Sequence, residues 1–189
     1  MKTNVIIFGF SGAGKSTAAD LVGKKLGLRV VHPSSILRDL LEGRRPRADR
    51  STAGTGFWEG ASGVSLFTSR LRDAKPADMR ADKILLKELK KGSVVMDSWT
   101  MPWLSPDGIK VYLKASFDER ARRVAKRSRI SLAESRRIVR MKDEETRKLN
   151  VRLYGFDMKK DHGVFDLVIS TENLTADQVA RLIVARAGQ

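Results

Sequence analysis

The chain has 189 residues, 41% of them apolar, which suffices for one globular domain with its own core. It has no cysteine and two histidines, which exclude a disulfide framework and a thiolate metal site and argue against a histidine-built metal centre. No apolar run approaches the roughly 18 residues of a membrane span, and the first residues lack the layout of a secretory signal. We therefore expect a cytoplasmic, monomeric protein that does not enter a membrane.

The chain is strongly basic, with a formal net charge of +15. Residues 114–152 hold 14 Lys or Arg against 6 Asp or Glu, and residues 43–50 form a second basic cluster. Such clusters are typical of nucleic-acid binding and of sites for phosphate-rich small substrates, and a solvated basic face is a third possibility. The charge indicates a polyanionic partner without identifying it.

A strand, a glycine-rich loop and a helix are predicted at the start of the chain. Residues 4–8 (NVIIF) form a short apolar run that predicts a buried strand. Residues 9–17 (GFSGAGKST) match G-x-x-x-x-G-K-[ST], the phosphate-binding loop, or P-loop, of nucleotide hydrolases and kinases. Residues 16–26 then show helical periodicity. This order is the context in which the P-loop motif binds phosphate, so a mere glycine turn is the weaker interpretation.

The residue types in this loop suit a nucleotide and its metal ion. Glycines at positions 9, 12 and 14 allow positive φ angles, so that backbone N–H groups can turn inward around an anion. Lys15 supplies a mobile charge for the β- and γ-phosphates and is a predicted catalytic residue. The Ser16 hydroxyl can ligate Mg²⁺. The predicted ATP-binding residues in the loop are Gly9, Ser11, Gly12, Ala13, Gly14, Lys15, Ser16 and Thr17.

Residues 28–32 predict a second short strand, which Pro33 ends. Ser34 or Ser35 is expected to cap the helix that follows, and Arg38 lies in its first turns. In a doubly wound sheet, ligands bind near the C-terminal ends of the strands. We therefore predict that Arg38 binds an anion, the alternative being an ordinary surface arginine.

Residues 43–63 are rich in Gly, Arg, Ser and Thr and predict a loop or irregular segment. Within it, Phe57 and Trp58 either cover a nucleobase or pack beneath the loop. Helices are predicted over residues 64–73 and 77–91.

The next predicted strand, residues 92–97, ends in an acid. An apolar strand that ends in aspartate resembles the Walker B element, whose carboxylate holds Mg²⁺. Asp97 is therefore a predicted metal ligand, together with Ser16, and a predicted catalytic residue. Trp99 and Trp103 follow at the expected ligand crevice, where they either stack on a base or close the edge of the core.

Residues 109–113 predict a fourth strand, which leads into two basic helices. The first helix, residues 117–126, carries Arg120, Arg123 and Arg127 on one face at spacings of three and four. The second opens at a capping box, residues 131–134, and runs to about residue 152. Arginines on one face repel one another, so we expect an anion between them, with a solvated basic hairpin as the alternative.

A last strand at residues 166–170 and a closing helix capped by Thr175 complete the predicted elements. They define an α/β P-loop NTPase fold with a five-stranded parallel sheet and helices on both faces. We predict a single domain, residues 1–189, with an acceptor-side segment at 34–75 and a small basic helical lid at 117–152.

The whole chain resembles the short archaeal-type cytidylate kinases, within the nucleoside monophosphate kinase group. The stretches that carry the resemblance are the P-loop, residues 34–38, Asp78, Asp82, Arg120, Arg123, Arg127, residues 154–157 and the final strand and helix. The resemblance implies that the P-loop holds ATP and that Arg38 grips the acceptor monophosphate. It also implies that Arg123 stacks on the donor base and that Arg127 neutralises charge during transfer.

Two departures from the family pattern concern mainly the acceptor side. Where the family commonly has an acidic residue, Gly and Arg, this chain has Asp97, Ser98 and Trp99. Further on, a family pattern similar to Arg-Glu-x-x-x-x-x-Arg-Tyr appears in this chain as Lys142-Asp143 and Leu149-Asn150, and neighbouring Arg140 or Arg147 are candidate substitutes. The predicted acceptor-binding residues are Ser35, Arg38 and Trp99.

The expected function is phosphoryl transfer from ATP, with Mg²⁺, to a nucleoside monophosphate, CMP or dCMP being the first choice. One alternative is a P-loop kinase that acts on a hydroxyl group of another small molecule, with Asp97 as base. The other is an NTPase switch that associates with RNA or the ribosome, for which RNA would be the partner.

Overall fold

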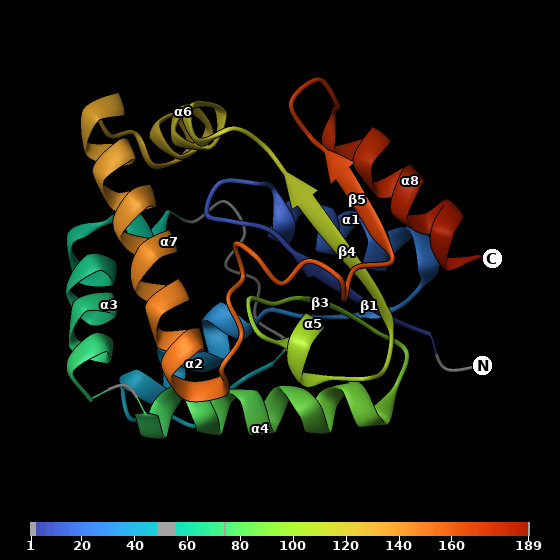
Figure 1. The fold of residues 1–189 in the computed structure, drawn as a ribbon, viewed down its shortest axis with the longest axis horizontal. Helices are drawn as coiled ribbons and strands as arrows, with labels where there is room; N and C mark the ends of the chain where they lie inside the picture. The colour runs from blue at the N-terminus through green and yellow to red at the C-terminus, as the bar shows by residue number, and fades with distance from the viewer. Residues whose placement is uncertain (1–2, 49–55, 74, 189) are drawn as a thin grey trace.

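The computed structural model describes residues 3–48, 56–73 and 75–188. Its sheet contains five strands, β1 (Asn4–Phe8), β2 (Arg29–Val31), β3 (Val94–Asp97), β4 (Ile109–Lys114) and β5 (Leu167–Ser170). They lie in the order β2-β3-β1-β4-β5, and every neighbouring pair is parallel (Figure 1). The predicted five-stranded parallel sheet is confirmed, and β1 occupies its centre.

The described helices connect and cover these strands (Figure 1). They are α1 (Lys15–Leu26), α2 (Pro33–Leu41), the short 3₁₀ helix η1 (Phe57–Glu59), α3 (Ala61–Asp73), α4 (Lys75–Lys91), α5 (Met101–Leu104), α6 (Phe117–Ser128), α7 (Leu132–Tyr154) and α8 (Ala176–Ala187). None of them is long and apolar enough to cross a membrane.

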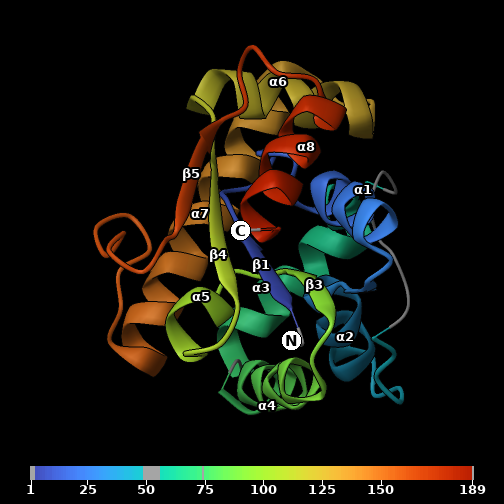
Figure 2. The ribbon, with the colours of Figure 1, turned by 90° about the vertical axis from the view of Figure 1, so that its right-hand side faces the viewer.

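The buried strand β1 contributes side chains to both faces of the sheet, because successive residues of a strand point in opposite directions. Val5 and Ile7 pack with the apolar residues of α1 and α8 on one face. Ile6 packs with those of α2, α4 and α5 on the other. Figures 1 and 2 show this arrangement of α1 and α8 opposite α4 and α5. The prediction of helices on both faces is confirmed.

Side-chain caps fix where three of the helices begin. Ser116 and Ser131 accept hydrogen bonds from the backbone N–H groups of residues 119 and 134, at the starts of α6 and α7. Thr175 and Gln178 form a complete capping box at α8. The caps predicted at Ser131 and Thr175 are confirmed, but the cap predicted at Ser34 or Ser35 was wrong, because α2 already begins at Pro33 and its N-cap residue is His32.

Several predicted boundaries were too narrow. Helix α3 begins three residues earlier than predicted and α4 two residues earlier, and α6 continues to Ser128. Arg129, at a φ of 55°, adopts the left-handed conformation that ends α6. Part of the predicted segment 43–63, including the end of the basic cluster at residues 43–50, lies outside the described residues.

Candidate functional site

A central cavity of about 510 Å³ lies where the P-loop, the C-terminal end of β3 and the lid helices α6 and α7 meet. Its remaining wall comes from α2, η1, α3 and α4. A ligand crevice at the C-terminal edge of a parallel sheet is the position expected for this class of fold. The predicted loop residues that line it are Ser11, Gly12, Gly14, Lys15, Ser16 and Thr17.

The three loop glycines have two different roles. Gly12 and Gly14 adopt φ angles of 82° and 92°, which side chains disfavour, as predicted. The prediction was wrong for Gly9, which does not have a positive φ. A Cβ at Gly9 would instead lie 2.7 Å from the backbone oxygen of Leu113. Gly9 is therefore needed for the close approach of the loop to β4, and neither Gly9 nor Ala13 lines the cavity.

Lys15 lies in the cavity wall beside an aromatic side chain. Its Nζ donates a hydrogen bond to the backbone oxygen of Phe10 at 3.3 Å and lies 5.0 Å from the ring centroid of Trp99. Desolvation lowers the pKa of Lys15 to about 8, although the nearby carboxylate of Asp97 opposes the shift. The side chain is thus held within the loop, next to a ring face that favours its charged form.

Ser16 and Asp97, the two predicted metal ligands, are in direct contact. The Ser16 Oγ donates a hydrogen bond to Asp97 Oδ2, while Oδ1 lies 2.9 Å from Nδ1 of the buried His32. One hydroxyl and one carboxylate are hard oxygen donors of the kind that Mg²⁺ takes, together with phosphate and water oxygens. Among the described residues, no group of three or more His, Cys, Asp or Glu side chains forms an all-protein metal site. The pair fits a magnesium ion that is shared with a nucleotide.

His32 also connects this pair to α1. Its Nε2 lies 2.9 Å from Oδ1 of Asp20. Burial lowers the pKa of His32, but the contacts with Asp97 and Asp20 outweigh burial and raise it above its usual value. The sequence carries no local signal for this bridge, because its three residues come from three different segments of the chain.

Each of the three aligned arginines has a carboxylate partner. Arg120 is buried and donates to Asp143 at 2.6 Å, and Arg123 donates to Glu119 at 2.9 Å. Arg127 lies 2.8 Å from Glu59. The expectation that an anion must lie between these arginines was therefore wrong in its premise, because Glu119 of the same helix and two carboxylates of other elements already pair with them.

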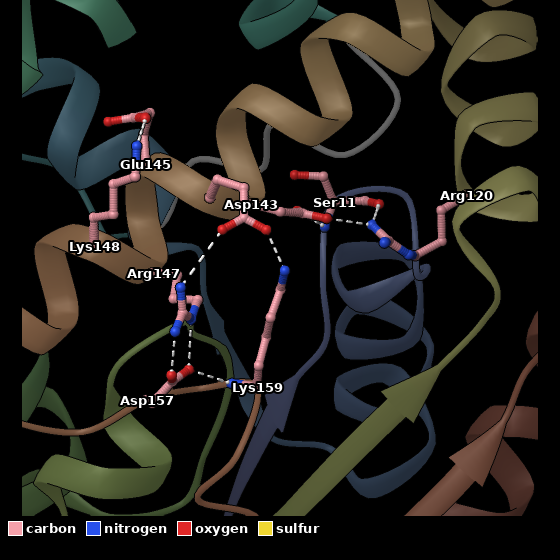
Figure 3. Close-up of polar contacts among 9 residues, drawn as sticks. Ser11, Arg120, Asp143, Glu145, Arg147, Lys148, Asp157 and Lys159 are labelled. Carbon is pink, nitrogen blue, oxygen red and sulfur yellow. Dashed lines mark hydrogen bonds and ion pairs between the residues drawn. The ribbon is translucent and has the colours of Figure 1, made fainter.

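Only two of these arginines reach the cavity. Arg123 and Arg127 line it, and Arg123 is also held by the side chain and backbone oxygens of Thr171. Arg120 instead donates to the backbone oxygen of Ser11 at 2.9 Å. Asp143 accepts from the N–H of the same Ser11, at 3.1 Å. The pair of Arg120 and Asp143 thus clamps the P-loop backbone to the lid helices (Figure 3).

The predicted acceptor-binding residues have different environments. Trp99 lines the cavity, as does Ser34, but Ser35 does not. The Ser35 hydroxyl is buried and donates to the backbone oxygen of His32 at 2.7 Å. Arg38 does not line the cavity either: its guanidinium lies 3.5 Å from the ring centroid of Phe57, which does, and its Nε donates to Glu42.

The aromatic side chains whose roles the sequence did not decide lie in two places, the wall of the central cavity and the edge of the core. Phe57 and Trp58 line the cavity with Trp99. Trp103 is partly buried and packs against the core cluster around Phe8, where it stacks on Phe156 with ring centroids 4.5 Å apart. The structure therefore distinguishes the two indoles after β3, placing one at the site and the other away from it.

Five charged residues in the cavity wall were not among the predicted site residues. They are Glu59, Arg70, Asp78, Asp82 and Lys142. Arg70 and Asp78 form a buried ion pair in which Arg70 Nε lies 3.0 Å from each carboxylate oxygen. Asp82 accepts hydrogen bonds from Thr100 and Tyr154, and burial raises the pKa of Asp82. Asp78 and Asp82 are among the residues that carry the family resemblance, whereas Arg70 carried no sequence signal.

The two candidate substitutes for the missing family arginine do not reach the cavity. Arg140 lies over the ring of Phe117, beside a smaller second pocket. Arg147 forms hydrogen bonds from two nitrogens to Asp157 (Figure 3). The hypothesis that Arg140 or Arg147 replaces the family arginine was therefore wrong. Both side chains project from faces of α7 that do not border the cavity.

The parallel sheet, the P-loop at its C-terminal edge and the helical lid define a P-loop kinase fold. The profile of the cytidylate kinase-like family matches residues 4–173, and the chain belongs to this family. The chain is 33% identical over 184 residues to the cytidylate kinase of Ignicoccus hospitalis, an alignment that covers 96% of each chain. It is 30% identical to the cytidylate kinase of Sulfurisphaera tokodaii, covering 96% of this chain and 93% of the relative.

Solved structures support the fold. An uncharacterized protein from Eubacterium ventriosum superposes with a TM-score of 0.69 at 13% identity, covering 100% of this chain and 99% of that one. A deoxyadenosine kinase from M. mycoides with bound dATP gives a TM-score of 0.56 at 19% identity, with 99% and 100% covered. A shikimate kinase from Acinetobacter baumannii gives 0.54 at 17% identity, with 97% and 92% covered. At these identities the likeness concerns the fold alone.

Proposed function

We propose that this chain transfers the γ-phosphoryl group of ATP to a nucleoside monophosphate, with CMP or dCMP as the preferred acceptor. Membership of the cytidylate kinase-like family and the named cytidylate kinases among its relatives support this proposal. The observation that carries it is the central cavity, in which Lys15 of the P-loop and Arg127 and Lys142 of the lid face one space. Phosphates of two substrates could meet there among positive charges.

The donor side of the proposed site is the P-loop with the lid arginines. The backbone N–H groups of the loop and the Lys15 ammonium would bind the β- and γ-phosphates, since all of them belong to the same tight turn. We assign Arg123 to the donor base and Arg127 to the charge that develops during transfer, and both side chains line the cavity. These arginines would keep their carboxylate partners, because each guanidinium has five N–H donors.

Ser16 and Asp97 would hold Mg²⁺. When bound, this ion screens the charge on the phosphate oxygens. His32 fixes one oxygen of Asp97, which leaves the other directed at Ser16.

The acceptor would bind against the wall formed by α2, η1, α3 and α4. Ser35 and Arg38 lie behind this wall, so they would act on the acceptor through Pro33, Ser34 and Phe57 or after a side-chain rearrangement. A monophosphate dianion is itself the nucleophile and needs no general base. The main tasks of the protein are then to align the two phosphates and to exclude water.

A hydroxyl acceptor remains the second candidate, because Trp99 stands in the wall where the family commonly has arginine. It would require a base, and both oxygens of Asp97 already have hydrogen-bonding partners. This favours an acceptor that brings its own charged nucleophile.

The test is ADP production from Mg-ATP with CMP, dCMP, UMP, AMP and GMP, and in parallel with cytidine and with an RNA sample. A strong response to CMP or dCMP is expected. Turnover with cytidine in place of CMP would establish the hydroxyl acceptor. If no small acceptor increased ADP production, and RNA increased it by an amount that fell as the salt concentration rose, the RNA-associated switch would replace the proposal.

A further inference from the structure

Glu59 joins the acceptor side of the molecule to the lid. It ends η1, and its side chain is only 5% exposed. Its Oε1 lies 2.6 Å from Nζ of Lys142 on α7, and its Oε2 lies 2.8 Å from Nη2 of Arg127 on α6. The hydroxyl of Ser128 donates to Oε2 at 3.4 Å. One carboxylate therefore holds two cations that come from different helices.

The three charged side chains all line the central cavity. Lys142 is 13% exposed and forms no other ion pair among the described residues. Burial lowers the pKa of Lys142, and Glu59 opposes this shift. Without Glu59, Arg127 and Lys142 would face each other as like charges in a partly dry space, and long flexible side chains would turn away toward water.

The backbone around Glu59 is closely packed. A Cβ at Gly63 would lie 2.0 Å from the backbone oxygen of Phe57, so the first turn of α3 fits against η1 only because this residue is glycine. A Cβ at Gly56 would lie 3.3 Å from the Ser128 hydroxyl. Glu59 thus projects from a segment packed against both α3 and α6.

We propose that Glu59 is a positioning residue for phosphoryl transfer, which holds Lys142 and Arg127 in the cavity wall so that their remaining N–H groups face the phosphates. The inference rests on the proposed function. An ammonium has three donors and a guanidinium five, and the ion pairs with Glu59 use one of each. Protein kinases use the same logic when a glutamate holds the lysine that binds phosphate.

The opposite role would have the opposite consequence. If Glu59 were an internal competitor that occupies the place of a phosphate, its removal would strengthen ATP binding. If it positions the cations, its removal weakens ATP binding and slows transfer. The sign of the change therefore decides between the two roles.

The experiment compares E59Q, K142A and the double variant by calorimetric titration with Mg-ATP and by ADP production with CMP. We expect E59Q to weaken Mg-ATP binding and to lower kcat, each about tenfold. Because Glu59 acts partly through Lys142 and partly through Arg127, the double variant should lose less than the sum of the two single losses. Tighter Mg-ATP binding by E59Q, an unchanged affinity, or fully additive losses would overturn the inference.

The matched control is E88Q. Glu88 is also a buried carboxylate with two basic partners, Arg29 and Lys91, but it does not line the cavity. E88Q should keep the wild-type affinity for Mg-ATP even if it lowers Tm as much as E59Q does. The calorimetric titration needs no acceptor, so it tests the role of Glu59 in ATP binding independently of turnover. If the wild-type protein phosphorylated no monophosphate, that result would refute the proposed function but not the role of Glu59 in ATP binding.

Discussion

Arg147 and Asp157 form a two-point ion pair, in which Nε lies 2.8 Å from Oδ1 and Nη2 lies 2.5 Å from Oδ2. The pair ties the last turns of α7 to the segment that follows this helix. The hydrogen bonds from Arg147 are the main reason that the pKa of Asp157 falls to about 2, below its usual 3.8.

This pair should stabilise the fold in a pH-dependent way. A carboxyl group with a depressed pKa contributes stability above its unfolded pKa, and this stability disappears as pH falls from about 4 toward 2. Asp157→Asn should therefore lower Tm at pH 7 and have a much smaller effect near pH 2. The control is Glu145→Gln, which removes a short-range pair with Lys148 on the same helix and should change Tm little at either pH. An equal loss for Asp157→Asn at both pH values would show that the charge is not responsible.

Lys15→Ala should reduce turnover by at least about a hundredfold, because it removes a charge directed at the transferring group. ADP production with saturating CMP measures this loss. Lys24→Ala removes an exposed lysine from the same helix and should leave turnover unchanged. Turnover near the wild-type rate in Lys15→Ala would refute the assignment of the P-loop.

Arg38→Ala tests the acceptor side. Because Arg38 stacks on the cavity residue Phe57, its loss should raise the KM for CMP about tenfold and change the KM for ATP less than about twofold. The exposed Arg45, in the loop after α2, provides the control variant Arg45→Ala, which should have no effect. If the KM for ATP rose instead, the donor and acceptor sites would have to be exchanged.

Trp99→Ala should raise the KM for ATP about fivefold, since the ring supports the charged form of Lys15 from a distance of 5.0 Å. Trp99→Phe keeps an aromatic face and should lie close to the wild type. Steady-state kinetics with both substrates varied gives the two KM values separately. A rise confined to the KM for the acceptor would instead make Trp99 an acceptor contact alone.

The sequence predicted the sheet and the loop because the signals for both are local. Apolar runs that end in turn residues located the strands, and the run that ends at Asp97 located the carboxylate that lies next to Ser16. Caps such as Thr175 depend on residues three positions apart, which makes them readable from the sequence as well.

The charge pairing of the site could not be predicted in the same way. Arg127 and Glu59 are far apart in the chain, as are Ser11 and Asp143, and only the fold brings them together. A pattern of arginines on one face of a helix reveals a basic surface, but it does not reveal carboxylates supplied by other elements. The same reason explains why Arg70 carried no signal and why the location of Arg38 behind Phe57 was not foreseen.

The central place of β1 in the sheet has a consequence for how the chain folds during synthesis. β1 pairs with β3 through Asn4 and Val94, and with β4 through Val5 and Ile109. Both partners follow much later in the chain, so β1 has no neighbour in the sheet until β3 has been made, and only one until β4 has been made. The apolar residues of β1 must be kept from other contacts during that interval. The P-loop, which follows β1 directly, therefore takes its final shape only after the chain as far as β4, against which Gly9 packs, has been made.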